Sequence, residues 1–112
     1  MTIGERGELR AAEYLQNKGF YILERNYRTR RGEIDLICAD DRYLVFVEVK
    51  TRKDESFAAA REFVTPAKQE RVRKTAMLWL QQNDVDLQPR FDVIEIVGQG
   101  RRQTIRHMEN AF

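Results

Sequence analysis

Two neighbouring apolar segments of this sequence each carry acidic side chains, at Asp35 and at Glu48. Residues 32–37 read Gly-Glu-Ile-Asp-Leu-Ile, and residues 46–50 read Phe-Val-Glu-Val-Lys. An unpaired carboxylate buried in an apolar strand either costs several kcal/mol or has its pKa raised until it is neutral. Two such carboxylates on adjacent strands therefore indicate a cation bound between them.

The spacing of these residues predicts the ligands of a hard divalent cation. Side chains alternate between the two faces of a strand, so Glu48 and Lys50 share a face. If the strands pair so that Asp35 neighbours Glu48, their oxygens and the Val49 backbone carbonyl can hold Mg²⁺ or Mn²⁺. Lys50 would then orient or deprotonate a water that attacks a phosphodiester. The alternative is a cross-strand ion pair on a solvated face, although the apolar run 44–47 favours a central strand.

The charge of the chain is nearly balanced but unevenly distributed. Of the 112 residues, 34% are charged, and the formal net charge is +2 at pH 7. Basic groups beside a cation site suit a polyanion that is drawn onto that site, whereas the alternative is that they only solvate the surface. The residues expected to bind nucleic acid are Arg28, Arg30, Arg31, Arg52, Lys53 and Lys68.

Length and composition limit the class of protein. A chain of 112 residues is predicted to form one domain, residues 1–112, with an adequate apolar core. No segment approaches the ~20 apolar residues of a transmembrane helix, and the first residues lack a signal-peptide pattern. The single cysteine, Cys38, excludes a disulfide framework within the chain. We therefore expect a cytoplasmic protein without membrane association.

Caps and turns predict the elements that position the acidic residues. Thr2 and Glu5 form a capping box that begins a first helix, and Gly19 ends it. Glu8 falls on the apolar inner stripe of that helix, which is an unusual place for an acid. Strands are predicted at 20–29, 34–39, 43–51, 91–97 and 104–108, of which the last is an edge strand.

The connections between these strands predict how they are arranged. Short turns join the first three strands into an antiparallel meander. Residues 52–64 are predicted as a loop or short helix beside the site. The N-cap Thr65 and Pro66 begin a second helix that runs to about Asn83. The order αβββαββ predicts an α/β domain with a mixed sheet and helices packed on it.

Several other polar or reactive side chains are expected to be structural. Cys38 and Trp79 are predicted in the core. Asp92 and Glu95 alternate with apolar residues and are expected to face solvent. His107, on the last strand, is expected to pack or form hydrogen bonds rather than to act as a general base.

The acidic segments resemble a known superfamily of nucleases. Residues 32–35 together with 46–52 are similar to the PD-(D/E)xK pattern. Nearly the whole chain resembles the YraN-like family of small bacterial proteins, which are described as related to Holliday junction resolvases. The segments that carry this closer resemblance are 4–8, 26–28, 68, 90–93 and 107–112.

The resemblance implies a restriction-endonuclease-like α/β fold and a metal-dependent endonuclease acting on branched or structured DNA, rather than RNA, with Mg²⁺ or Mn²⁺. It places Asp35, Glu48 and Lys50 at catalytic positions. It also makes Glu8 the first-helix acid of the resolvase-like branch, a further catalytic residue and metal ligand, so all four side chains are expected in one cleft. Some relatives carry Gln-x-x-x-Tyr in the second helix, whereas this chain lacks that tyrosine.

Two other classes of protein remain open from the sequence. One is a non-catalytic module that binds nucleic acid on the same scaffold. The other is an interaction protein whose cation site is purely structural. For the nuclease, symmetric cleavage of a junction needs two active sites, which a twofold homodimer would supply.

Overall fold

The chain alternates helices and strands in the order that the sequence predicts. The computed structural model describes residues 1–53 and 64–112. The elements are α1 (Ile3–Asn17), β1 (Tyr21–Thr29), β2 (Gly32–Ala39), β3 (Tyr43–Arg52), α2 (Pro66–Gln82), β4 (Gln88–Val97), the 3₁₀ turn η2 (Gly100–Arg102) and β5 (Thr104–Met108). Most of the predicted loop or short helix at 52–64 lies outside the described residues.

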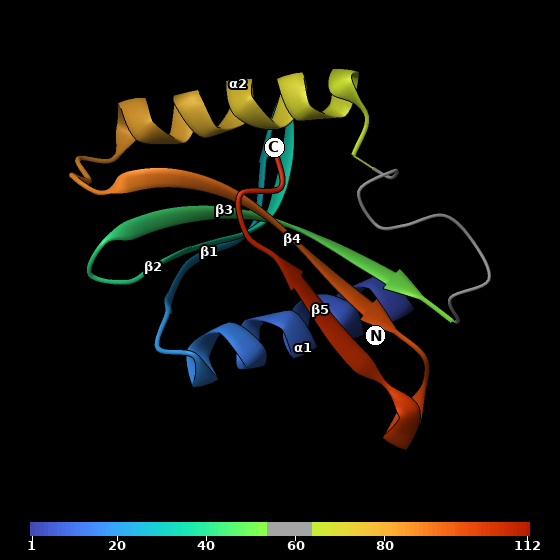
Figure 1. The fold of residues 1–112 in the computed structure, drawn as a ribbon. Helices are drawn as coiled ribbons and strands as arrows, with labels where there is room; N and C mark the ends of the chain where they lie inside the picture. The colour runs from blue at the N-terminus through green and yellow to red at the C-terminus, as the bar shows by residue number, and fades with distance from the viewer. Residues whose placement is uncertain (54–63) are drawn as a thin grey trace.

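The strands form one mixed sheet in the order β1-β2-β3-β4-β5. Neighbouring strands are antiparallel except for β3 and β4, which are parallel and are connected through α2. Helix α1 covers one face of the sheet and α2 covers the other (Figure 1). The predicted α/β class, the meander of the first three strands and the edge position of the last strand are confirmed.

Side-chain caps begin both helices where the sequence predicts. The Thr2 side chain accepts a hydrogen bond from the Glu5 backbone N–H at 3.1 Å, and Gly19, with φ of +100°, ends α1. The Thr65 side chain likewise accepts from the Lys68 N–H at 3.2 Å. Among the described residues, no helix is long and apolar enough to cross a membrane.

Strand β3 contributes to an apolar cluster on each face of the sheet, which confirms its central position. Val45 and Val47 pack with α1 on one face, and Leu44 and Phe46 pack with α2 on the other. The apolar inner stripe predicted for the first helix, Ala11, Ala12 and Leu15, is buried, and so are Cys38 and Trp79, which are predicted in the core. A strand with both faces covered leaves its polar side chains little access to water.

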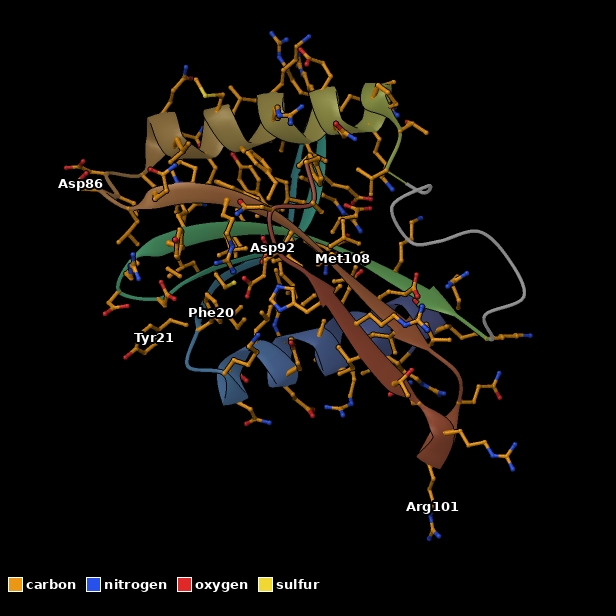
Figure 2. All side chains as sticks on the ribbon, in the orientation of Figure 1. Phe20, Tyr21, Asp86, Asp92, Arg101 and Met108 are labelled. Carbon is orange, nitrogen blue, oxygen red and sulfur yellow. The ribbon has the colours of Figure 1, made fainter. Side chains whose placement is uncertain are left out.

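The expectation that Asp92 and Glu95 face solvent is wrong, because both side chains are fully buried in β4. Strand β4 is paired on both edges and covered on both faces, so its alternating pattern does not mark an exposed face. Asp92 accepts two hydrogen bonds from Arg90, at 3.0 and 2.9 Å, and lies 2.7 Å from His107 Nε2. Glu95 accepts from Arg52 at 2.9 Å. Burial of these acids depends on such charged partners. Figure 2 shows Asp92 inside the molecule.

Candidate active site

Strands β2 and β3 separate at the position of the predicted acidic residues. Their antiparallel register runs from Ala39 opposite Leu44 to Leu36 opposite Val47. The earlier residues of β2, from Gly32 to Ile34, pair with β1 on the other side. Asp35 therefore lies just past the last paired position, where the two strands diverge. We call this place the fork.

The Asp35 carboxylate spans the fork to reach β3. Its Oδ2 accepts a hydrogen bond from the Val49 backbone N–H at 2.8 Å. In a strand, the N–H and C=O of one residue point to the same side, so the Val49 carbonyl is also directed toward β2. The Asp35 carboxylate and the Val49 carbonyl, two of the groups that the sequence predicts as metal ligands, therefore both lie in the fork between β2 and β3.

Asp35 is a buried carboxylate with other negatively charged side chains nearby, and both conditions raise its pKa. Burial is the largest influence and, with the nearby charge of Glu48, raises the Asp35 pKa to about 7. The hydrogen bond from Val49 acts in the opposite direction, and the charges of Glu8 and Glu33 raise the pKa further. A bound cation would relieve both the burial cost and the repulsion.

Glu48 has a partner that the sequence does not predict. Its carboxylate lies 2.7 Å from the ammonium of Lys68, which belongs to the first turn of α2. Both residues line a pocket of about 220 Å³ together with Gly32 and Glu33. Lys68 is expected from the sequence to contact phosphate, and no local signal shows that α2 brings it to β3. In this structure it instead neutralises a predicted metal ligand.

Lys50 lies beside these two charges. Burial and the nearby Lys68 ammonium lower the Lys50 pKa, whereas Glu48 and Asp35 act to raise it. The side chain is half-buried and follows Glu48 by two positions on β3, so the two share a face of the sheet. Asp35, Glu48, Lys50 and Lys68 therefore form one electrostatically connected group.

Glu8 is placed on the other side of the fork. It lines a separate hollow of about 190 Å³ with Glu5, Arg25 and Asn26, between α1 and the first strands. Its charge still contributes to the raised pKa of Asp35. The structure thus brings Glu8 and Glu48 toward Asp35 from the α1 side and the α2 side, respectively, and does not place them in one pocket.

The oxygen set suits a sparsely ligated cation. Within residues 1–53 and 64–112, no three acidic, histidine or cysteine side chains converge to form a metal cluster. Mg²⁺ commonly takes only one or two carboxylates and keeps several waters. Asp35, Glu48 and the Val49 carbonyl fit that requirement, provided that Lys68 releases Glu48.

Most of the basic residues predicted to bind nucleic acid are exposed, but Arg52 is not. Arg28 forms an exposed ion pair with Glu33 at 3.1 Å, and Arg30, Arg31 and Lys53 are exposed. The Arg52 guanidinium is largely buried against Glu95. The Gln69 side chain donates to the Val64 carbonyl at 3.1 Å. Exposed cations at the turn between β1 and β2 remain the simplest contacts for a polyanion.

The fold and this group define a small α/β domain whose central strand carries an acid-x-lysine motif at the edge of a fork. A family model described as "Uncharacterised protein family UPF0102" matches residues 7–96. The chain belongs to the UPF0102 family, which confirms the YraN-like resemblance.

Relatives from several organisms match nearly the whole chain. A UPF0102 protein of Pelobacter propionicus is 47% identical over 113 residues, covering 97% of this chain and 81% of the relative. One from Geotalea daltonii is also 47% identical and covers 99% of this chain and 89% of its own. One from Rhodococcus opacus is 43% identical over 100% of this chain and 97% of its own.

Proposed function

We propose that this protein is a metal-dependent endonuclease that hydrolyses phosphodiester bonds in branched or structured DNA. The observation that supports this most is the state of Asp35. Its buried carboxylate, with a pKa raised to about 7, faces Glu48 and accepts a hydrogen bond from Val49 across the fork. Buried acids with strongly perturbed pKa values are more common at functional sites than elsewhere.

The metal ligands would be Asp35, Glu48 and the Val49 carbonyl. All are oxygen atoms, which is the ligand chemistry that Mg²⁺ and Mn²⁺ prefer. The bound ion supplies positive charge at the phosphate that is attacked. Glu8, from the other side of the fork, would add to the negative charge that attracts the ion.

Lys50 would act on the attacking water. Its pKa is lowered by burial and by Lys68, which brings the ammonium closer to proton exchange near neutral pH. Because Lys50 and Glu48 share a face of β3, a water near the metal ligands is also near the Lys50 amine. Exposed Arg30 and Arg31 at the β1–β2 turn would hold the phosphate backbone.

The second candidate function is a nucleic-acid-binding platform without catalysis. The observation that favours it is the 2.7 Å ion pair between Lys68 and Glu48. This pair balances the charge of a predicted ligand without any metal. In that case the basic surface would bind DNA, and Asp35 and Glu48 would be relics of the scaffold.

A cleavage assay distinguishes the two functions. Wild-type protein is incubated with junction, flap, linear duplex and single-stranded DNA, with and without Mn²⁺, beside the Asp35→Asn variant and an exposed control, Asp84→Asn. We expect metal-dependent cleavage of at least one branched substrate by the wild type and the control, and none by Asp35→Asn. Tight binding of branched DNA without any metal-dependent cleavage would replace the nuclease with the platform.

A cytoplasmic location and a homodimer with two active sites are consistent with this proposal. Sedimentation of the protein with and without a four-way junction would test the dimer. Two protomers per junction are expected.

A further inference from the structure

A groove of about 760 Å³ opens at the end of the sheet where β3 and β4 finish. Three segments line it: the start of α1, the end of β3 and the turn between β4 and β5. These segments are far apart in the sequence, but they lie at the same end of the molecule (Figure 1). The groove is distinct from the pocket that Glu48 and Lys68 line.

Among the described residues, the charged side chains that line the groove are all basic. Arg6 and Lys53 are exposed at its wall. The third, Arg52, is bonded to the buried Glu95 at 2.9 Å. No acidic side chain is among the described residues that line the groove. The described part of the groove therefore presents only positive side-chain charge to an anion.

The backbone around the groove also favours an anion. The first turn of α1 forms part of the wall, and a helix N-terminus carries partial positive charge. Gly7 allows α1 to approach β3 closely, since a Cβ there would lie 2.8 Å from the Thr51 methyl. Gly98, with φ of +91°, shapes the opposite wall. Arg101, from the same turn, projects away from the body of the molecule (Figure 2).

The lining residues indicate which part of a nucleic acid would bind. Among the described residues, no aromatic side chain lines the groove, so this part of the groove favours contact with the backbone of a strand over base stacking. Its neutral polar groups include the amides of Gln99 and Gln103. Its volume is that of a pocket for a compact ligand, which suits a few nucleotides of one strand better than a duplex.

The groove and the candidate active site occupy successive parts of β3, although Lys50 and Thr51 face opposite sides of the strand. Lys50 belongs to the candidate site, and Lys53 lines the groove three positions later. At the rise of a strand, this separation is about 10 Å.

We propose that this groove binds the sugar-phosphate backbone of an unpaired nucleic-acid strand, next to the position where the strand is cut. This proposal rests on the proposed nuclease function and specifies its substrate. Arg6 and Lys53 contact phosphates without reading bases. With an unpaired arm in the groove, the candidate active site would act near the junction between that arm and the duplex. The separation between the groove and Lys50 would then determine how far from the start of the unpaired arm the strand is cut.

Binding isotherms over a range of salt concentrations test this. The probes are a DNA duplex with and without a short unpaired overhang, in EDTA so that nothing is cleaved. The test variant is Arg6→Gln/Lys53→Gln. The control, Arg10→Gln/Lys74→Gln, removes the same charge from exposed residues outside the groove.

We expect the test variant to bind the overhang substrate about tenfold more weakly and its salt slope to fall by about 1.4, which corresponds to two lost single-strand phosphate contacts. Binding of the blunt duplex should match that of the control. The proposal is overturned if the overhang gives the wild type no added affinity, or if test and control variants bind it equally well.

Cleavage measurements separate this proposal from the proposed function. If no wild-type cleavage occurs but the test variant loses overhang affinity, the groove stands and the nuclease fails. If wild type cleaves, Asp35→Asn does not, and the test variant keeps overhang affinity, the nuclease stands and the groove fails.

Discussion

The Lys68 ammonium lies 2.7 Å from the Glu48 carboxylate, so a side chain of α2 neutralises the strongest predicted metal ligand of β3. Both side chains are largely removed from solvent, with 29% and 10% of their side-chain surface exposed. A divalent cation at the proposed site and this ammonium would therefore compete for the same oxygen atoms. That competition would make metal binding depend on a residue that is not itself a ligand.

Replacing Lys68 with methionine should strengthen metal binding. We expect Lys68→Met to bind Mn²⁺ about tenfold more tightly, because no ammonium has to leave Glu48. Without metal the variant should be less stable than wild type, since Glu48 loses its partner in a partly buried place. Calorimetric titration with Mn²⁺ and melting curves measure both effects. Lys74→Met, at an exposed position of the same helix, is the control, and an affinity equal to that of the control would contradict the competition.

Replacing Lys50 with alanine should separate catalysis from binding. If Lys50 acts on the attacking water, Lys50→Ala should slow single-turnover cleavage by ~10²-fold or more and leave DNA affinity nearly unchanged. Arg31→Gln should do the reverse, weakening binding and lowering its salt slope by about one unit. The two variants are compared by cleavage rate at saturating protein and by binding isotherm. A Lys50→Ala variant that cuts at the wild-type rate would remove Lys50 from the mechanism.

The raised pKa of Asp35 predicts how stability depends on pH. Burial and Glu48 raise this pKa from 3.8 to about 7, so the folded state holds the proton more tightly than the unfolded chain. The free energy of unfolding should therefore fall as pH rises between these two values, in the absence of metal. Asp35→Asn cannot titrate and keeps an acceptor for the Val49 N–H.

Relative to wild type, Asp35→Asn should be more stable above pH 7 by a few kcal/mol at most, and the difference should shrink in acid. Urea unfolding at acidic and mildly alkaline pH, in EDTA, measures it. The exposed Asp41→Asn is the control. A difference between Asp35→Asn and wild type that stays constant with pH would show that folding does not change the Asp35 pKa.

Local signals in the sequence predict much of the fold and the positions of the acidic residues on β2 and β3. The caps at Thr2 and Thr65 and the alternation along β3 depend on neighbouring residues, and the structure has them as predicted. The ion pair of Lys68 with Glu48 and the burial of Asp92 depend on which elements meet in three dimensions. No periodicity encodes such partners, so both were beyond prediction from a single sequence.

The buried acid of β4 should be important for stability. The Asp92 pKa is lowered: burial alone would raise it, but hydrogen bonds from His107, Arg90 and the Asn110 N–H outweigh that effect. Asp92→Ala leaves Arg90 buried without its partner, and such losses cost ~3–5 kcal/mol. Asp92→Asn keeps an acceptor and should cost less.

The Asp92 contribution to the free energy of unfolding changes with pH in the opposite direction to that of Asp35. A lowered pKa stabilises the fold above the ordinary carboxyl pKa of 3.8, and this contribution is lost as pH falls further. The gap in unfolding free energy between wild type and Asp92→Asn should therefore narrow in strong acid. Chemical denaturation over that pH range measures the gap, and one that widens would contradict the assignment.

The parallel seam between β3 and β4 has a kinetic consequence. Its register joins Tyr43 to Gln88 across α2 and the segment before it, whereas short turns join β1, β2 and β3. Closing a long loop costs more chain entropy, so contacts of this kind tend to form late in folding. A nascent chain would thus present the acids of the β2–β3 fork before α2 docks with Lys68. During that interval the proposed divalent ion would meet no rival for Glu48, so it could occupy the fork before Lys68 reaches the carboxylate.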